Sequence, residues 1–301
     1  MIHSIKQIFI VLGFALLITV SLVGCSSSTK VVDPKTFGPV PSTAELASEY
    51  NARIEPLDSF WSRISIRAKG KYDNGDLYEE QGTGHLQIQR PGNISLSIRK
   101  LGELYFSYGA NHEHYWAINL LDKEHKTMQI GRLDRMTPEK AAIVGMQVHP
   151  GQLSALMGLQ PIDLTKAGGT RWAPDGKSVG VTSSSPWGSF TLWIDPRTYQ
   201  AVRSESFNSQ GSLIATVSLT RFTEAKIPDA RPIQVPGKVE IRYPNDEEGF
   251  VRIEISEPAQ RTIRPMVFDP NKLNRGNRIH ETIDLDAFDT PASTDSDLNG
   301  D

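Results

Sequence analysis

The sequence predicts a mainly β protein with a few short helices, in which one antiparallel sheet curls and the helices cover it. Three observations support this class. Apolar and polar residues alternate along about twelve segments, as they do in strands with one wet face. The connections are short, so neighbouring strands pair antiparallel, and no stretch is long or polar enough to separate a second domain. An antiparallel sheet of about twelve strands has to curl.

The chain opens with the pattern of an export signal. Lys6 precedes an apolar run over residues 8–23, which is shorter than the roughly 20 apolar residues that a membrane-spanning helix needs. The run ends in LVGC at residues 22–25, which resembles the lipobox of bacterial lipoproteins. That resemblance implies removal of the signal before Cys25, the only cysteine in 301 residues, and attachment of acyl chains such as palmitate to it. An uncleaved anchor with an incidental cysteine is the alternative, and either reading tethers the domain to a membrane.

Composition divides the rest of the chain. Residues 1–24 are the expected signal peptide, 25–41 the lipidated cysteine and an extended tether, 42–258 the folded domain, and 259–301 a C-terminal extension with an acidic, disordered tail. Removing the signal leaves 31 Lys and Arg against 35 Asp and Glu, a net charge of −4. That charge gives no reason to expect a nucleic-acid partner.

The folded domain is expected to begin with an amphipathic helix. Apolar residues recur at intervals of three and four over residues 43–60, with Ser42 or Thr43 as the N-cap. Pro56 is expected to kink this helix or end it early.

Strands follow in two runs, separated by two short helices. The first run starts at residues 63–69, and the Asn-Gly pair at 74–75 predicts a hairpin turn because it tolerates positive φ. A Thr-Pro start predicts a helix over 137–146, and a second helix is expected at 152–157. The remaining strands are expected at 77–89, 94–99, 104–108, 115–120, 126–130, 178–182, 189–194, 201–207, 213–222, 238–243 and 249–255.

Large apolar residues gather on one face of several strands, and the two short helices are apolar enough to cover that face. Such a face either lines a cavity or fills an ordinary core. Alternation does not distinguish the two, because each keeps water off one face. The candidate cavity residues are Leu86, Ile88, Leu96, Ile98, Leu104, Phe106, Trp116, Ile118, Leu120, Met128, Ile130, Ile143, Met146, Leu153 and Met157.

Three strings in the folded domain resemble the lipoprotein-localisation superfamily of LolA and LolB. Residues 94–104 (ISLSIRKLGEL) resemble a strand that runs into a protruding loop with an exposed Leu before a Gly, and Leu101 and Gly102 are the matching pair. Residues 150–159 (PGQLSALMGL) resemble the lid segment, a short helix that ends in a Gly-Leu step. Residues 194–203 (IDPRTYQAVR) resemble a strand-turn-strand pattern of the superfamily. The lipobox favours the anchored LolB branch over the soluble LolA branch.

The resemblance implies an unclosed antiparallel half-barrel, lidded by short helices, that shelters acyl chains. It implies that the loop at Leu101 and Gly102 enters a membrane, that acylated lipoproteins or lipid are the cargo, and that a soluble periplasmic carrier is the donor. Ser26 stands where Asp would indicate inner-membrane retention, which favours an outer-membrane anchor facing the periplasm. We therefore expect a lipoprotein that binds acyl chains and receives or sorts lipoproteins, a chaperone in lipoprotein transport. The alternative is a non-enzymatic envelope interaction or stress-sensing module with the same fold.

Other features argue against catalysis or fall outside the resemblance. His112, Glu113 and His114, with His125 nearby, form the only cluster of metal-ligand types, and the pattern fixes no third ligand. No Gly-x-Ser-x-Gly elbow, Walker loop, dinucleotide fingerprint or His-Glu-x-x-His string occurs. We therefore expect no enzyme, cofactor or metal. Residues 261–301 have no counterpart in LolB, and their basic stretch either touches an anionic membrane or solvates the domain.

Overall fold

The computed structural model describes residues 38–71, 75–144, 148–185, 187–246 and 248–289. The described residues belong to one compact unit, Pro34–Asp301, which holds all the helices and strands described below. The expected signal peptide, Cys25, the tether up to residue 37, Met146 and the tail from residue 290 lie outside the described residues.

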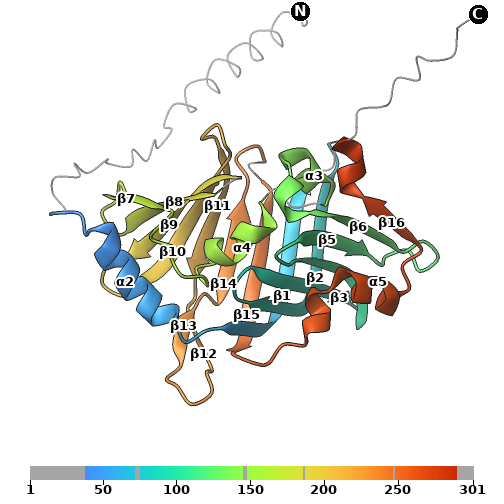
Figure 1. Ribbon diagram of the computed structural model, residues 1–301, viewed down its shortest axis with the longest axis horizontal. Coiled ribbons are helices and arrows are strands. Elements are labelled where there is room, and N and C mark those ends of the chain that lie inside the picture. Colours follow the sequence, from blue (N-terminus) through green and yellow to red (C-terminus); the bar gives the residue numbers. More distant parts are fainter. Residues whose placement is uncertain (1–37, 72–74, 145–147, 186, 247, 290–301) are drawn as a thin grey trace, which may run out of the picture. The chain divides into compact units, whose positions relative to one another are not determined.

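Most strands of the described chain belong to one curled, unclosed sheet (Figure 1). Its order is β16-β6-β5-β4-β3-β2-β1-β15-β14-β11-β10-β9-β8-β7, so β16 and β7 are its edges. Neighbours are antiparallel except β16, which runs parallel to β6. This confirms the mainly β class. The bounds are β1 Ser59–Lys71, β2 Leu77–Gln89, β3 Asn93–Lys100, β4 Glu103–Ala110, β5 His114–Asn119, β6 Thr127–Arg132, β7 Ala167–Trp172, β8 Val179–Ser185, β9 Gly188–Asp195, β10 Gln200–Phe207, β11 Leu213–Thr220, β14 Lys238–Arg242, β15 Phe250–Ala259 and β16 Glu281–Asp284.

The sheet consists of two meanders that meet at β1. Strands β1 to β6 follow one another outward through short turns, and the second meander starts at the far edge with β7 and returns through β14 and β15. The return places Ile255 opposite Ile64, although they are far apart in the sequence. Strands β12 (Thr223–Ala225) and β13 (Ile233–Val235) form a separate two-stranded sheet.

Short helices complete the unit. Helix α2 has the expected cap, since Ser42 Oγ accepts a hydrogen bond from Glu45 N at 3.2 Å. It ends at Ile54, earlier than the expected residue 60, because proline at 56 lacks an N–H and the chain turns there into β1. The helices are α2 Thr43–Ile54, η2 Leu133–Arg135, α3 Pro138–Ile143, α4 Pro150–Leu156, η3 Pro265–Phe268, α5 Pro270–Asn277 and η4 Leu285–Asp289.

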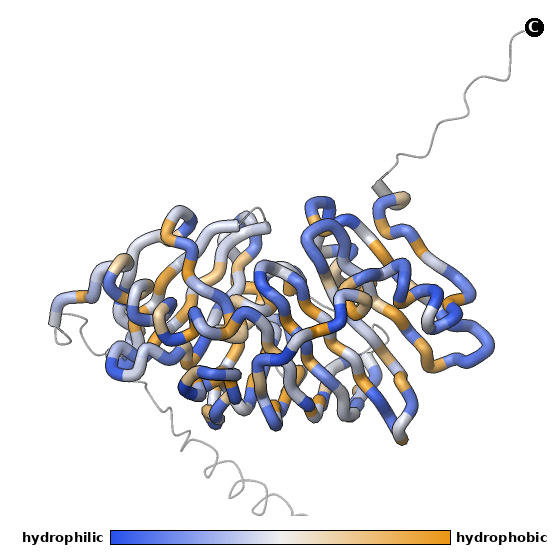
Figure 2. Tube along the Cα trace, turned by 60° about the horizontal axis from the view of Figure 1, so that its bottom comes forward, coloured by the Kyte–Doolittle hydropathy of each residue, from blue (hydrophilic) through white to orange (hydrophobic). Residues whose placement is uncertain are grey.

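Apolar side chains form two clusters on opposite faces of the sheet. The inner cluster lies on the face that α2 and α4 cover, and it draws on both meanders, with Leu46, Tyr50 and Leu156 among its fully buried members. The outer cluster is smaller. Hydrophobic positions recur along the strands of both meanders (Figure 2). The outer cluster comprises Trp116, Ile118, Met128, Ile263 and Phe268, with Leu120, Ile130, Val267, Leu273 and Ile279 packed against them.

Candidate functional site

The inner face holds seven of the candidate cavity residues. Leu86, Ile88 and Leu96 are buried there, and Ile98 and Phe106 are half-buried against the same cluster. The register explains this, because Leu86 pairs with Leu96 and Ile98 pairs with Phe106, and directly opposite residues share a face. The other two come from the α4 region and are buried in the same cluster: Leu153 and Met157.

Five other candidates lie on the opposite face, which corrects the expectation of one shared lining. In the β4–β5 pairing, Tyr108 is opposite Ala117, and both belong to the inner cluster. Their neighbours Trp116 and Ile118 therefore point outward. Residues of the C-terminal extension cover them, including Phe268. The five outward residues are Trp116, Ile118, Leu120, Met128 and Ile130.

The remaining described candidates lie in neither cluster. Leu104 lines a hollow near the β3–β4 turn, and Ile143 on α3 is 48% exposed. Ile143 therefore does not cover the inner face in this structure.

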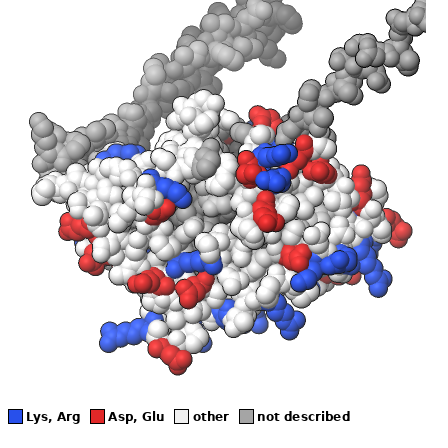
Figure 3. Space-filling view, viewed as in Figure 1, with Lys and Arg blue, Asp and Glu red and all other residues white. Residues whose placement is uncertain are grey.

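Helix α4 contacts β10 from one meander and β3 and β4 from the other. On the β10 side it is held by hydroxyl groups: Ser204 Oγ donates to Leu156 O at 2.7 Å, and Ser206 Oγ donates to Gln152 Oε1 at 3.3 Å. Leu153 adds apolar contact to the inner cluster. The helix carries no charged residue, and Figure 3 shows few charged side chains over it. In the sequence, the only sign of this contact is that Ser204 and Ser206 occupy alternate positions of a strand and so point to the same face. The pattern by itself does not indicate that they bind a helix.

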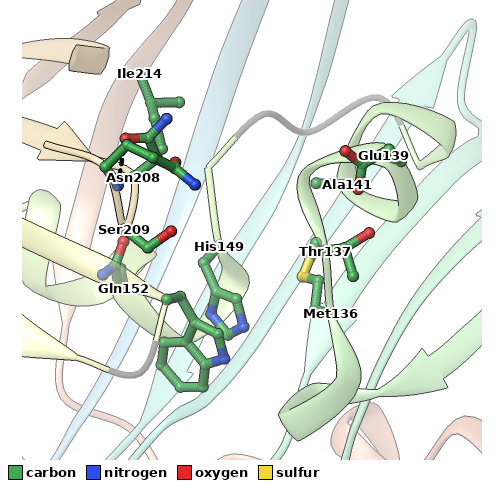
Figure 4. Close-up of a pocket in the computed structure, with 11 residues that line it drawn as sticks. Met136, Thr137, Glu139, Ala141, His149, Gln152, Asn208, Ser209 and Ile214 are labelled. Carbon is green, nitrogen blue, oxygen red and sulfur yellow. Dashed lines mark hydrogen bonds between the residues drawn. The ribbon is translucent and has the colours of Figure 1, made fainter. Parts of the chain in front are cut away.

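A groove of about 540 Å³ opens beside α4, within the usual size range of ligand pockets. One wall comes from α3 and the connection that precedes it, and the other from the β10–β11 turn, with His149 between them (Figure 4). Met136 and Ala141 belong to the inner cluster and Ile214 packs against it, so the groove borders the apolar interior. We call it the rim groove. Its residues are Met136, Thr137, Glu139, Ala141, His149, Gln152, Trp187, Asn208, Ser209, Gln210 and Ile214.

His149 is fixed and uncharged. Its ring stacks on Trp187, with centroids 3.5 Å apart and planes 13° apart. Gly151 N donates to Nδ1 at 3.1 Å, so Nε2 carries the hydrogen and donates to Leu133 O at 3.3 Å. Burial lowers the pKa of His149 to about 4, against the opposing effect of the Leu133 hydrogen bond. The groove therefore has a neutral, rigid aromatic pair at neutral pH.

The α3 wall is anchored from behind by the C-terminal extension. Lys140 Nζ pairs with Asp286 Oδ1 at 2.9 Å, and these side chains are only 5% and 12% exposed. Arg132 N donates to the second oxygen, Asp286 Oδ2, at 2.9 Å. Lys140 Nζ also donates to Arg135 O at 3.1 Å, so the buried charges have hydrogen-bond partners.

The β3–β4 turn presents a fully exposed leucine. The Leu101 side chain is as exposed as in an isolated residue, with a relative accessibility of 101%. Both residues of the turn have positive φ, 53° at Leu101 and 85° at Gly102. Positive φ is costly for a branched apolar residue and natural for glycine. Nearby charges are paired, since Lys100 bonds Glu80 at 3.0 Å and a second pair, Lys123 with Glu103, lies at 2.8 Å. Leu121 on the β5–β6 connection is 58% exposed and lines the same hollow of about 430 Å³ as Leu101.

Within the described ranges, no group of three His, Cys, Asp or Glu side chains is placed to hold a metal ion. Over those same residues, no helix is long and apolar enough to cross a membrane.

Solved structures share this fold. A putative outer membrane lipoprotein-sorting protein domain from Vibrio parahaemolyticus is 12% identical, with a TM-score of 0.52 over 77% of this chain and 97% of that chain. A DUF1329 family protein from Desulfovibrio piger has the same identity and TM-score over 80% of this chain and 100% of that chain. A LolA superfamily protein from Nitrosomonas europaea, also 12% identical, has a TM-score of 0.49 over 76% and 97% of the two chains.

No protein-family model and no curated protein matches the sequence. At the level of fold, the structural likeness agrees with the superfamily resemblance seen in the sequence, while the closer likeness to LolB stays a prediction. Over the described residues, the chain therefore shares its fold with the Vibrio parahaemolyticus and Desulfovibrio piger structures.

Proposed function

We propose that this protein is a lipoprotein anchored in the outer membrane and facing the periplasm, which binds the acyl chains of other lipoproteins and receives or sorts them. The observation that carries the proposal is α4, an uncharged helix of seven residues that closes an apolar inner face. The lipoprotein-sorting domain with the same fold supports this reading. No step in the proposal needs a catalytic residue.

Acyl chains bind on the inner face between α4 and the β2–β4 strands. Each buried methylene contributes about 0.8 kcal/mol, so an apolar surface is sufficient and no charged group is required. The residues that line this surface are Leu86, Ile88, Leu96, Ile98, Phe106, Leu153 and Met157.

Displacement of α4 makes room for the chains. Hydroxyl hydrogen bonds, such as that from Ser204 to Leu156 O, hold one side of the helix. A typical intramolecular hydrogen bond contributes a net of about 1 kcal/mol, which water or a shifted helix can replace. The rim groove lies beside α4 and borders the inner cluster, so it is the path by which a chain reaches the interior.

The β3–β4 turn docks the domain on the membrane to which a cargo is delivered. Burying one leucine contributes about 1.5–3 kcal/mol. The lysines and glutamates beside Leu101 are paired with one another, and the remaining cation of the turn, Arg99, donates to Gly102 O at 3.0 Å and can meet lipid phosphates at the membrane surface. An exposed Leu at positive φ is strained without a compensating fold contact, which is typical of functional positions.

The close packing of the inner face favours a second candidate function. Its strand and helix residues are nearly all inaccessible in this structure, as in a filled core. If that core does not open, the domain is a non-enzymatic interaction module that uses the rim groove and its exposed turn to bind or sense envelope proteins.

Binding of a fluorescent acyl probe to the unit Pro34–Asp301 tests the proposal, because this unit has its own core. A triacylated lipopeptide should displace the probe and its unacylated counterpart should not. Ser204→Ala removes one bond that holds α4, so it should raise acyl affinity up to about fivefold. Ser256→Ala is the matched control, because Ser256 Oγ donates to Arg63 O at an exposed site. Absence of probe binding by the folded unit would favour the interaction module.

A further inference from the structure

The rim groove carries polar groups that are held in place by their own hydrogen bonds. Gln152 Nε2 donates to Ser185 Oγ at 2.7 Å and Gln152 Oε1 accepts from Ser206 Oγ at 3.3 Å. Asn208 Oδ1 accepts from two backbone N–H groups of its own turn, at 3.1 and 2.8 Å. The Asn208 side chain therefore turns its amide N–H groups to other acceptors. Fixed amides of this kind match the N–H and C=O groups of a peptide backbone.

The rim groove carries a net negative charge. Glu139 is the one charged side chain among its described lining residues, and no lysine or arginine joins it there. The Thr137 hydroxyl and the backbone N–H of Glu139 lower the pKa of its carboxyl group, so it is ionised at neutral pH. His149 is neutral. A phosphate or an acidic peptide would therefore meet a net negative groove, and a basic peptide would meet a complementary one.

The position of the groove connects these polar groups to the apolar interior. Met136 and Ala141 line the groove and also belong to the inner cluster. A ligand whose acyl chains occupy the inner face would therefore place its polar portion between α3 and the β10–β11 turn (Figure 4).

We infer that the rim groove binds the polypeptide segment that follows the acylated cysteine of a cargo lipoprotein, and that it prefers basic or neutral segments to acidic ones. This inference rests on the proposed function and adds a second, polar contact to it. Acyl chains supply most of the affinity, and the groove supplies discrimination among cargoes.

The test compares four ligands on the unit Pro34–Asp301 at low ionic strength: a triacylated cysteine with a lysine-rich peptide, the same lipid with an aspartate-rich peptide, the acylated cysteine alone, and the free lysine-rich peptide. The lysine lipopeptide should bind about fivefold more tightly than the aspartate lipopeptide. Glu139→Gln should remove most of that difference. Glu49→Gln should leave it unchanged, because Glu49 is exposed on α2 and does not line the groove.

Each other outcome overturns the inference in a distinguishable way. Equal binding of the two lipopeptides, or a difference that survives in Glu139→Gln, would refute peptide recognition in the groove and leave acyl binding intact. Failure of all three acylated ligands to bind a folded unit would refute the proposed function together with this inference. Tighter binding of the acylated cysteine alone than of either lipopeptide would show that the groove excludes polypeptide.

Discussion

The inner and outer clusters share strand β5 but are covered in different ways. On β5, Tyr115 and Ala117 point to the inner cluster and Trp116 and Ile118 to the outer one. The inner cover is made of α2 and the short, uncharged α4. The outer cover is the segment from Ile263 to Ile279, which continues into β16 and η4, where Ile283 and Leu285 pack against the inner cluster.

The attachments of the two covers differ in kind. The outer segment is held by Asn111 Nδ2, which donates to Phe268 O at 3.0 Å, by the parallel pairing of β16 with β6, and by the buried Lys140–Asp286 pair. The β10 side of α4 is held by hydroxyl and amide groups. We infer from this difference that the outer cover stabilises the fold, whereas α4 in the inner cover is suited to move when a ligand binds.

Phe268→Ala should break the outer cover and give the largest effect. Phe268 is buried against Trp116 and Met128, so its loss should lower the free energy of unfolding by about 3–5 kcal/mol. Urea unfolding measures this. Phe250→Ala is the matched control, because it removes an aromatic ring that is only half-buried, and it should lower the free energy of unfolding by less. A cost below that of the control would show that the extension does not stabilise the sheet.

Lys140→Met should loosen the link between the outer cover and the groove wall. It leaves Asp286 buried without its cation, which costs about 3 kcal/mol or more. Lys123→Met removes an exposed pair with Glu103 and should cost less than about 1 kcal/mol. Thermal or urea unfolding of the two variants checks the contrast, and equal costs would contradict a structural role for the buried pair.

His149→Phe should change how the free energy of unfolding depends on pH, and so test whether the groove histidine is buried in its neutral form. The folded-state pKa of His149, about 4, lies below its ordinary value of 6.5, so the unfolded chain binds the proton first as pH falls. The associated stability is present above pH 6.5 and is lost as pH falls toward 4, by up to about 3 kcal/mol. Phenylalanine keeps an aromatic ring at the stacking position and should flatten this part of the curve. An unchanged slope would place the titration elsewhere.

Leu101→Asn should separate membrane contact from folding, with the smallest effect on stability. Asparagine tolerates φ of 53° better than leucine, so unfolding free energy should stay level or rise slightly. Vesicle binding should fall by about tenfold or more, because one inserted leucine contributes about 1.5–3 kcal/mol. Co-sedimentation with vesicles measures it, with Leu101→Phe as the apolar control. Unchanged sedimentation of the Asn variant would contradict insertion of this turn.

Local physics made part of this molecule predictable. The cap at Ser42, the alternation on β2 and β3, and the short turns led to the correct fold class because they depend on neighbours in the chain. Alternation on β5 showed two faces without showing which one points inward, so Trp116 and Ile118 were assigned to the wrong face.

Features set by distant segments were not predictable from local patterns. The parallel pairing of β16 and the Lys140–Asp286 pair join residues more than a hundred positions apart. The rim groove likewise brings together four segments, and its amides and hydroxyls have no spacing that distinguishes them from ordinary surface residues.

Photo-crosslinking with a triacylated lipopeptide that carries a photoreactive group at the end of an acyl chain tests most directly which face binds ligand. Peptide mapping after irradiation of the unit Pro34–Asp301 should find adducts on Leu86, Leu96, Phe106 or Leu153, all on the inner side. Adducts confined to Trp116, Met128 or Phe268 of the outer cluster would contradict an acyl-binding inner face.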